Sequence, residues 1–408
     1  MVIVLFILVL LTGCQNNDVF NKKIDVSKYN VNFYEQLLLD KNNIKSREYG
    51  LDSVNREKNI NTLYLTNYSE DLNLDGKSDD VYYFSGNSLD NWVKFGKNKS
   101  GNELYWRIIR INEDNSVRML YSGTSPATQE AYIDKSTYSY VSYKIVKLDD
   151  GDSRKEATGN LNPYMGYMYG DGVTLEDSRK NTNDSNVKEI IDNWYKGSLL
   201  KKKDNNGNVY DKYISRTAIY CNDRSVHHID KYNDIYFNGY DRIFYFDSSY
   251  YCGNHLTGEK FIEDNFTAKN ENGIGNQLLD YPVGLMSIDE ISFAGSTRWN
   301  DDAEAWYYNN SDNLSITGDI DWITMSPSMY DGYSSPSIYA VNSVKEQSCS
   351  NCKYIAPGMI IEGSSYFNEY AIRPVISIKS CVKYMDGTGT VENPYELIID
   401  EQCIEEDN

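Results

Sequence analysis

Short aromatic and β-branched segments, separated by polar residues, recur along the chain from about residue 81 onward. The clearest pair is 105–111 and 117–121, which the polar residues 112–116 join. Two such segments across a short polar turn predict a β-hairpin. The same pattern predicts further strands at 81–84, 92–95, 322–327, 337–341 and 371–378.

One amphipathic helix is predicted at 186–197. Its apolar residues fall at positions i, i+3, i+4 and i+7, which share one face of a helix. These residues are Val187, Ile190, Ile191 and Trp194. Ser185 or Asn186 can cap the first turn, and Gly197 suits the end.

A second, shorter helix is predicted to begin after Ser287 and to close near Gly295. The segment Ser287-Ile288-Asp289-Glu290 is a capping box. Residues 148–186 are rich in Gly, Asp, Ser and Asn, so we expect a long loop or insertion there. Two short helices, many short strands and long loops predict a mixed α+β domain.

The N-terminus has the pattern of an export signal. Its apolar run is about half the roughly 20 residues that a membrane-spanning helix needs, and it suits a signal peptide. Leu11-Thr12-Gly13-Cys14 resembles the bacterial lipobox, in which small residues precede a cysteine that becomes lipidated. The resemblance implies a signal peptide at 1–13 and a lipid on Cys14. No Lys or Arg precedes the run, so a truncated or cytosolic N-terminus is the alternative.

Residues 14–58 are polar, apart from an amphipathic patch at 33–39. We read them as a flexible tether with a short helix, and 59–408 as an ectodomain held outside the membrane by the lipid. No internal repeat is visible.

Composition limits the function classes. The chain has 408 residues, with 60 acidic against 40 basic side chains and a net charge of −20, so it would repel nucleic acid. Its 40% hydrophobic and 13% aromatic content excludes a disordered chain. The 37 tyrosines suit β-surfaces and wet recognition faces.

Six cysteines remain after Cys14, an even number that favours disulfides in an exported chain. Pairing of nearest neighbours would give Cys221–Cys252, Cys349–Cys352 and Cys381–Cys403. Six cysteines allow 15 pairings, and all six can also stay reduced.

Two cysteine patterns have alternative chemistries. Cys349-Ser350-Asn351-Cys352 has the spacing of a redox-active pair, but its flanks favour a small structural disulfide. Cys221 and Cys252 lie near all three histidines (His227, His228 and His255), so zinc is the alternative to a disulfide there.

Residues 71–79 resemble the beginning of a calcium loop. Asp71, Asn73, Asp75 and Asp79 supply oxygen ligands, and a glycine at 76 allows a sharp turn. The closing glutamate is missing, because Tyr82 occupies that position. A solvated turn is the alternative, since Asp, Asn and Gly also build turns.

Motifs of the common enzyme classes are missing: there is no G-x-S-x-G, H-E-x-x-H, P-loop or G-x-G-x-x-G. Asp289-Glu290 is the one carboxylate pair worth testing as an acid/base pair, and its first role is helix capping. The triplet 299–301 spells W-N-D, which lectins use for calcium, but the loop that precedes it in lectins is missing.

The order of several motifs resembles a large, functionally uncharacterised family of bacterial surface domains. The motifs are Trp106-Arg107-Ile108-Ile109, the helix at 190–194, Gly284 to Glu290, Trp322 to Pro327 and Ile372-Arg373-Pro374-Val375. This layout is similar to the sulfatase-modifying-factor branch of the C-type-lectin fold. The resemblance implies a C-type-lectin-like α+β domain with Arg373 packed inside it. Residues 386–395 resemble a tail of Gram-positive surface proteins, which we place at 384–408.

These patterns predict a lipid-anchored protein on the outer face of a bacterial membrane that binds a glycan or a surface protein non-covalently. Its only predicted cofactor is calcium. The loops 148–186 and 296–316 are the expected places for the binding surface. An extracytoplasmic hydrolase or modifying enzyme on the same scaffold is the alternative, and a structural envelope component is a third.

Overall fold

The predicted hairpin lies within the larger of two β-sheets. In the computed structural model, β5 (Glu103–Ile111) and β6 (Val117–Tyr121) pair antiparallel, with Trp106 opposite Tyr121. Asn115 in the connecting turn has a φ of 63°, a conformation that asparagine tolerates better than most residues. The hairpin prediction is therefore confirmed.

The structure describes most of the chain from residue 24 onward. The described residues are 24–39, 44–48, 63–67, 72, 77–136, 142–147, 153–158, 166–171, 174–230, 235–245, 248–254, 259–260, 262–270, 273–296, 305–330, 337–343, 346–347, 354–355, 358–364 and 369–405.

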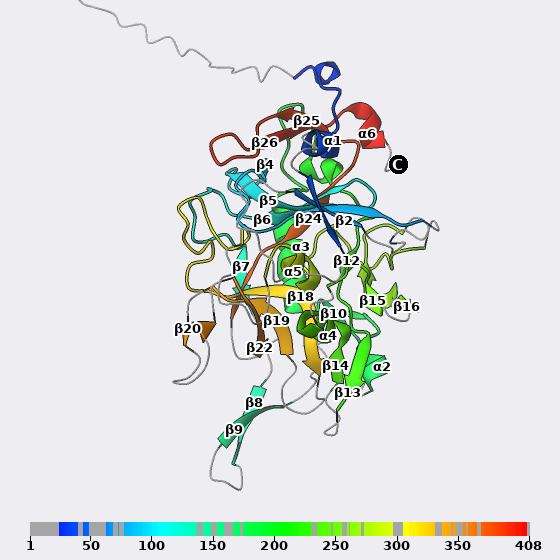
Figure 1. The fold of residues 1–408 in the computed structure, drawn as a ribbon, viewed down its shortest axis with the longest axis vertical. Coiled ribbons are helices and arrows are strands. Elements are labelled where there is room, and N and C mark those ends of the chain that lie inside the picture. The colour runs from blue at the N-terminus through cyan, green and yellow to red at the C-terminus, as the bar shows by residue number, and fades with distance from the viewer. Residues whose placement is uncertain are drawn as a thin grey trace, which may run out of the picture.

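Nine strands form the larger sheet, which occupies the upper half of Figure 1. Along it the strands follow the order β1-β2-β3-β5-β4-β26-β25, with β6 beside β5 and β24 beside β6. The other strands of this sheet are β1 (Ile44–Glu48), β2 (Leu63–Asn67), β3 (Asp80–Phe84), β4 (Trp92–Lys97), β24 (Val375–Ile378), β25 (Lys383–Asp386) and β26 (Tyr395–Ile398). The pairs β1–β2 and β26–β4 are parallel.

Seven strands form the smaller sheet in the lower half of Figure 1, in the order β13-β14-β18-β19-β22, with β23 beside β18 and β7 beside β23. These strands are β7 (Asp134–Ser136), β13 (Val226–Ile229), β14 (Ile235–Phe237), β18 (Trp322–Tyr330), β19 (Ser337–Val341), β22 (Ile360–Ser364) and β23 (Tyr370–Ile372). The predictions of strands at 322–327 and 337–341 are confirmed.

Besides the two large sheets, the described residues form five short antiparallel pairs of strands. They are β8 (Ser142–Lys147) with β9 (Ser153–Thr158), β10 (Met168–Tyr169) with β11 (Asn183–Asp184), β12 (Tyr220–Cys221) with β17 (Asn265–Phe266), β15 (Gly253–Asn254) with β16 (Glu259–Lys260), and β20 (Glu346–Gln347) with β21 (Tyr354–Ile355). Parts of the expected insertion at 148–186 are thus ordered as β9, β10 and β11.

The described residues include six α-helices: α1 (Phe33–Leu38), α2 (Leu175–Ser178), α3 (Asn186–Gly197), α4 (Asn238–Tyr245), α5 (Ile288–Phe293) and α6 (Glu401–Glu405). Three 3₁₀ turns lie at Val26–Lys28, Tyr210–Tyr213 and Ile262–Asp264. The predicted helices α3 and α5 are confirmed, with Ser185 and Ser287 as their N-caps. The pattern at 33–39 correctly indicated α1, whereas α2, α4 and α6 were not predicted.

The chain passes from one sheet to the other at Arg373-Pro374. The segment 371–378, predicted as one strand, divides there into β23 of the smaller sheet and β24 of the larger sheet. Proline has no N–H to donate to a sheet, which explains the interruption. The carbonyl of Pro374 still accepts a hydrogen bond from the Tyr121 N–H at 2.9 Å.

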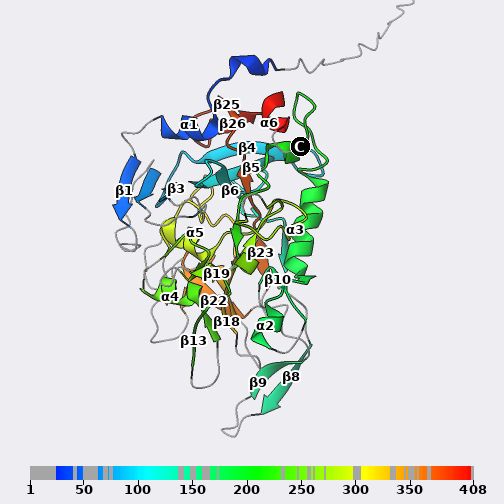
Figure 2. The ribbon, with the colours of Figure 1, turned by 90° about the vertical axis from the view of Figure 1, so that its right-hand side faces the viewer.

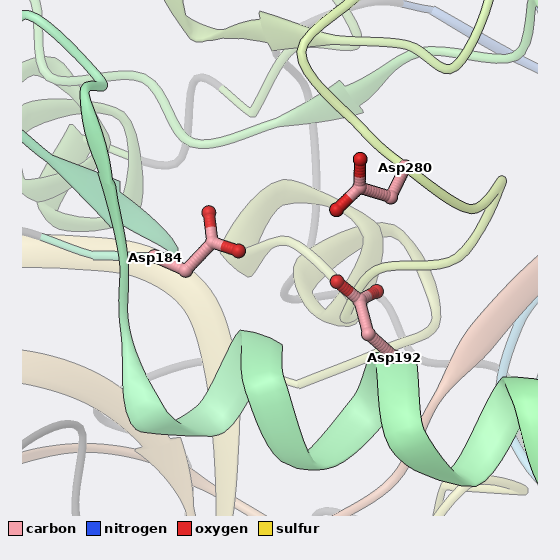
Figure 3. A group of neighbouring side chains, drawn as sticks. All are labelled: Asp184, Asp192 and Asp280. Carbon is pink, nitrogen blue, oxygen red and sulfur yellow. The ribbon is translucent and has the colours of Figure 1, made fainter.

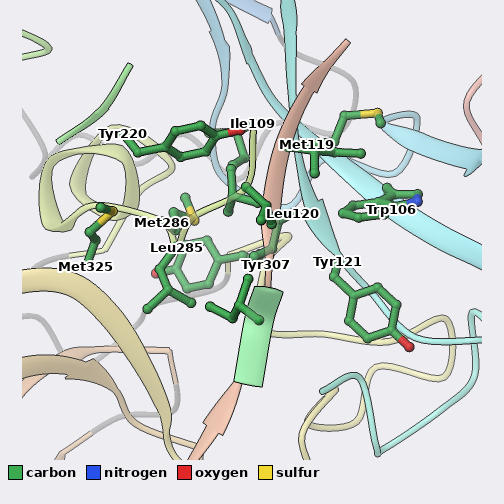
Figure 4. Close-up of a cluster of buried hydrophobic side chains, with 14 of the residues drawn as sticks. Trp106, Ile109, Met119, Leu120, Tyr121, Tyr220, Leu285, Met286, Tyr307 and Met325 are labelled. Atoms are coloured by element: carbon green, nitrogen blue, oxygen red, sulfur yellow. The ribbon is translucent and has the colours of Figure 1, made fainter. Parts of the chain in front are cut away.

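One continuous apolar core lies between the sheets and the helices. Figure 4 shows side chains of β5 and β6, such as Ile109 and Leu120, beside Leu285 and Met286 from the loop before α5. All four are buried. The described elements therefore form a mixed α+β fold that is mostly β-sheet, as predicted.

Part of the segment expected as a tether packs against the larger sheet. Phe33 is fully buried, and its N–H donates to the Val382 carbonyl at 2.8 Å. Before it, the N–H of Ile24 donates to Asn206 Oδ1 at 2.8 Å, and Asn206 Nδ2 donates back to the Ile24 carbonyl. Residues 24–39 are therefore fixed to the fold near β25 and α6 (Figure 2).

Two disulfides are present among the described residues. Cys221 bonds Cys252, with Cα atoms 5.6 Å apart, and Cys381 bonds Cys403, with Cα atoms 5.5 Å apart. They fit the expectation of disulfides, whereas Cys349 and Cys352 lie outside the described residues. Within the described ranges, no helix combines the length and apolar character needed to cross a membrane.

Candidate functional site

The carboxylate pair on α5 belongs to a buried network of ion pairs. Asp289 lies 2.7 Å from Arg242, and Glu290 lies 2.6 Å from Arg118 and 3.2 Å from Arg110. All five side chains are buried. Removal of one partner from such a network leaves an uncompensated charge, so these carboxylates stabilise the fold through their arginines.

A small cavity of about 30 Å³ lies beside this network. It is lined by the Cys221–Cys252 disulfide and by Asn265, whose Oδ1 is buried without a hydrogen-bond partner. This volume holds about one water molecule, which can donate to that oxygen. The cavity is therefore too small for a substrate.

Three carboxylates gather around a lysine at the beginning of α3. Figure 3 shows Asp184, Asp192 and Asp280 turned toward one another, with one oxygen of each within 4.8 Å of the others. The Lys188 ammonium lies 2.9 Å from Asp184, 2.9 Å from Asp192 and 3.8 Å from Asp280. Lys188 therefore supplies the positive charge that a metal ion would otherwise bring.

Opposing effects act on the pKa values in this cluster. Burial by itself lowers the pKa of Lys188, but the attraction of Asp192 and Asp184 outweighs burial and leaves that pKa above its usual value. Burial raises the pKa of Asp192, and the attraction of Lys188 only partly offsets the rise. Ionisation of the buried Asp192 is therefore less favourable than ionisation of an exposed aspartate.

Of the proposed calcium ligands, the structure describes only Asp79. Asp79 is buried, and its Oδ2 accepts a hydrogen bond from the Leu72 N–H at 2.7 Å. Asp71, Asn73 and Asp75 lie outside the described residues, as do Cys14 and the W-N-D triplet at 299–301. The observed contact of Asp79 is therefore this hydrogen bond to the backbone of Leu72.

Of the proposed zinc ligands, the two cysteines form a disulfide and two of the histidines are exposed on a strand. Cys221 and Cys252 are joined in a disulfide, so neither is a thiolate that could bind a metal. His227 and His228 are exposed on β13, where the His228 ring stacks on Tyr236 with a centroid distance of 4.5 Å. His255 lies outside the described residues.

A groove of about 530 Å³ runs beside α3, and we call it the α3 groove. Its volume is within the range of small-molecule sites. It is lined by residues from the β4–β5 turn, from the stretch that runs from the end of β6 to the start of β7, and from α3 with its C-cap: Asn98, Lys99, Ser100, Tyr121, Thr124, Glu130, Tyr132, Ile133, Asp134, Ile190, Asn193, Trp194, Gly197 and Ser198. None of them lies in the loops expected to bind a ligand.

Aromatic side chains form the apolar part of the α3 groove. The Trp194 ring meets Tyr121 edge-on at a centroid distance of 5.6 Å, and the buried Trp106 at 6.2 Å. Trp106 itself is fixed by a hydrogen bond from Nε1 to the Phe95 carbonyl at 2.7 Å. Trp194 therefore rests on a rigid aromatic support, while its own indole N–H has no partner among the described residues.

The sequence pattern did not reveal that part of the apolar face of α3 lines this groove. The side chains of Val187, Ile191 and Tyr195 are fully buried, whereas Ile190 and Trp194 are half-buried and line the groove. Lys188 and Asp192 complete the buried face of α3. Both are charged, so the spacing of apolar residues did not identify them as buried. Only the excess of aromatic residues in the composition hinted at such a surface.

Arg373 supports the floor of the groove from behind. Its guanidinium donates to the carbonyls of Tyr121 at 3.1 Å and Tyr307 at 2.7 Å, and lies over the ring of Trp322. Arg373 is fully buried, which confirms that it packs inside the domain. Burial lowers its pKa, and among the described residues no carboxylate pairs with it. The Arg373 guanidinium thus contacts backbone carbonyls and the Trp322 ring in place of a carboxylate.

Polar groups surround the aromatic part of the groove. Asn193 and Tyr132 present side chains without hydrogen-bond partners among the described residues, and Glu130, Asp134 and Lys99 are exposed. Burial raises the pKa of Tyr121 to about 12, so its hydroxyl stays protonated at neutral pH. The groove combines a rigid apolar wall with free hydrogen-bonding groups.

Comparison with known proteins yields no match to a protein-family model, to a curated protein or to a solved structure.

Proposed function

We propose that the chain is a lipid-anchored cell-surface protein whose ectodomain binds a glycan non-covalently in the α3 groove. The observation that carries this proposal is Trp194: a half-buried indole, held by Trp106 and Tyr121, in the wall of a groove rich in polar groups. Sugar rings have apolar faces that stack on aromatic side chains and hydroxyls that need hydrogen-bond partners. The groove offers both.

The location is proposed from the N-terminus and the cysteines. The lipobox-like sequence ending at Cys14 supports a lipid anchor, and disulfides persist outside the reducing cytosol. The order of the sequence motifs, from Trp106-Arg107 to Arg373-Pro374, and the capping box of α5 support a C-type-lectin-like version of the observed α+β fold. On this proposal the protein lies on the outer face of a bacterial cell membrane.

Binding to immobilised cell-wall and host-type glycans tests the function. The purified full-length chain should bind at least one class, and Trp194→Ala should weaken that binding about tenfold or more, because a tryptophan that a ligand covers commonly contributes much of the binding energy. Tyr384→Ala, which removes a partly buried aromatic side chain of β25 that does not line the groove, is the matched control. Failure to bind any glycan, or full binding by Trp194→Ala, would refute the proposal.

The lipid anchor has its own test. In a bacterial host that lipidates exported cysteines, the wild-type chain should partition with the membrane, and Cys14→Ser should be released from it. Equal membrane association of the two proteins would remove Cys14 from the proposal.

Glu130 and Asp134 favour glycoside hydrolysis as a second candidate, because hydrolysis uses two carboxyl groups beside the sugar. Both are exposed, whereas a general acid is usually activated by an apolar environment. Binding without turnover is therefore the function that the geometry supports best. New reducing ends in a bound glycan, lost in Glu130→Gln, would make hydrolysis the better assignment.

A further inference from the structure

Two hydroxyl groups in the lining of the α3 groove belong to almost completely buried side chains. Tyr121 exposes 5% of its surface and Ser198 exposes 1%, and both residues line the groove. Neither hydroxyl bonds any residue that the structure describes, whereas the hydroxyl of the equally buried Tyr213 donates to Asp204 at 2.6 Å. Buried polar groups are normally paired. The partners of these two hydroxyls must therefore come from what fills the groove.

Both residues are neighbours of Trp194. The centroids of the Tyr121 and Trp194 rings are 5.6 Å apart. Ser198 follows Trp194 by about one helical turn, and its N–H donates to the Trp194 carbonyl at 3.0 Å. Figure 4 shows the Tyr121 hydroxyl directed away from the labelled core side chains. The groove thus brings an aromatic face and two hydroxyls without partners into one place.

Tyr121 is held in position before any ligand arrives. Its N–H donates to the Pro374 carbonyl at 2.9 Å, and its ring meets that of Trp106 edge-on at a centroid distance of 5.7 Å. A polar group that is already ordered loses little entropy on binding. Its hydroxyl can therefore discriminate between ligands that offer it a partner and ligands that do not.

The charge of Arg373 favours one direction for the hydrogen bond of Tyr121. Arg373 donates to the Tyr121 carbonyl at 3.1 Å from behind the groove, and no described carboxylate pairs with it. A hydroxyl dipole turns its oxygen toward a positive charge and its hydrogen away. Because burial raises the pKa of Tyr121 to about 12, this hydrogen is present at neutral pH. The Tyr121 hydroxyl is thus best suited to donate to an acceptor in the groove.

We propose that the α3 groove binds a sugar that carries an N-acetyl group, with the Tyr121 hydroxyl donating to the carbonyl oxygen of that group and the Ser198 hydroxyl bonding another polar group of the same sugar. This inference rests on the proposed function and specifies its ligand class. An amide carbonyl is an uncharged acceptor, so the net charge of −20 does not repel it as it would a carboxylate. The methyl group can pack on the half-buried Ile190.

Two tetrasaccharides with the same β-1,4 linkages test the selection: one of N-acetylglucosamine and one of glucose. They differ at carbon 2, where the first carries an acetamido group and the second a hydroxyl. In titration calorimetry with the full-length chain at neutral pH, the N-acetylglucosamine tetramer should bind about three- to tenfold more tightly, the effect of one hydrogen bond between uncharged groups. A galacturonate tetramer tests an anionic acceptor and should bind more weakly than the acetylated one.

Single-group variants locate the effect. Tyr121→Phe removes only the hydroxyl, and it should bind the N-acetylglucosamine tetramer about three- to tenfold more weakly and lose the preference over the glucose tetramer. Ser198→Ala should weaken the binding of both tetramers. Tyr281→Phe is the matched control, because its ring packs on Tyr195 of α3 at a centroid distance of 5.3 Å but does not line the groove. Melting curves check that each variant is folded.

The outcomes separate this inference from the proposed function. Equal affinity of the wild type for the N-acetylglucosamine and glucose tetramers would overturn selection of the N-acetyl group and leave glycan binding intact. Retention of the preference by Tyr121→Phe would overturn the role of its hydroxyl, and wild-type affinities in Ser198→Ala would overturn that of Ser198. Tightest binding of the galacturonate tetramer, or binding of none of the three, would also overturn the inference, whereas binding of another glycan in the wider survey would still support the proposed function.

Discussion

Arg373 Nε donates a hydrogen bond to the Tyr121 carbonyl oxygen at 3.1 Å and joins two residues that are 252 positions apart. Arg373 lies where the chain leaves the smaller sheet for the larger one, and Tyr121 ends β6 at the floor of the α3 groove. One guanidinium thus connects the passage between the sheets to the candidate binding surface.

Replacement of Arg373 should destabilise the protein. Arg373→Met leaves the buried carbonyls of Tyr121 and Tyr307 without these donors, and each lost donor costs about 1–3 kcal/mol. We expect Arg373→Met to lower the free energy of unfolding, measured with urea, by about 2–4 kcal/mol. Arg373→Lys should have an intermediate stability, because an ammonium cannot reproduce the planar set of donors of a guanidinium. A stability equal to that of the wild type would show that the guanidinium is dispensable.

Tyr121 should make the fold sensitive to alkali. Its pKa is raised from 10 in the unfolded chain to about 12 by burial, so the folded state holds its proton more tightly. This contribution to stability is fully present below about pH 10 and is lost as the pH rises through about 12. Tyr121→Phe should therefore lose less stability over this range in fluorescence-monitored unfolding. Parallel pH profiles for the two proteins would contradict the assignment.

Lys188 should hold the acidic cluster together. Lys188→Met leaves three carboxylates without their shared cation, and we expect a loss of about 3–5 kcal/mol at neutral pH. The raised pKa of Asp192 makes its ionisation unfavourable to folding, a cost that is absent below a pH of about 3.8 and sets in as the pH rises. The difference in free energy of unfolding between Lys188→Met and the wild type should therefore become smaller as the pH falls.

Denaturant unfolding over a series of pH values measures this difference, with Lys188→Arg as the control that keeps the charge. If the difference in free energy of unfolding between Lys188→Met and the wild type stays constant toward acid, the variant is destabilised by altered packing and not by the missing charge.

The two disulfides should contribute similar stability. They close loops with sequence separations of 31 and 22 residues, for which the chain-entropy relation gives about 3–4 kcal/mol each. Cys221→Ser/Cys252→Ser and Cys381→Ser/Cys403→Ser should each lower the free energy of unfolding by about this amount. A reductant should destabilise the wild type and leave a variant without cysteines unaffected; insensitivity of the wild type would contradict a stabilising role.

Calcium binding by the 71–79 loop remains a proposal with a simple test. If Asp71, Asn73, Asp75 and Asp79 bind the ion, a chelator should lower the melting temperature and calcium should restore it, because a ligand of the folded state stabilises it. Asp75→Asn should abolish this response. A melting curve indifferent to both additions would favour the solvated turn.

Local patterns predicted local structure well. The hairpin at 105–121, the helix α3 and the capping box of α5 depend on neighbouring residues, so spacing and capping chemistry were sufficient. The division of 371–378 between two sheets depends on partners far away in the sequence. A proline within the segment was the one available signal, and the strand pattern outweighed it.

The binding surface was harder to predict than the fold. Trp194 has the spacing of a core residue, and only its neighbours in space make it part of a groove. Glu130 and Asp134 are two among 60 acidic residues, so nothing in the sequence distinguishes them. Lys188 was not recognised as buried either: Asp184 and Asp192 lie four residues from it on either side, but such i,i+4 ion pairs are equally typical of an exposed helix face.

The pairing of Ile24 with Asn206 would limit the distance between the domain and a bilayer if Cys14 carries the proposed lipid. Ten Cα–Cα steps separate Ile24 from Cys14, and even a fully extended chain spans only about 35 Å over that distance. If Cys14 carries the proposed lipid, the end of the molecule with α1, β25 and α6 faces the lipid headgroups, and the β8–β9 hairpin at the opposite end points outward (Figure 1).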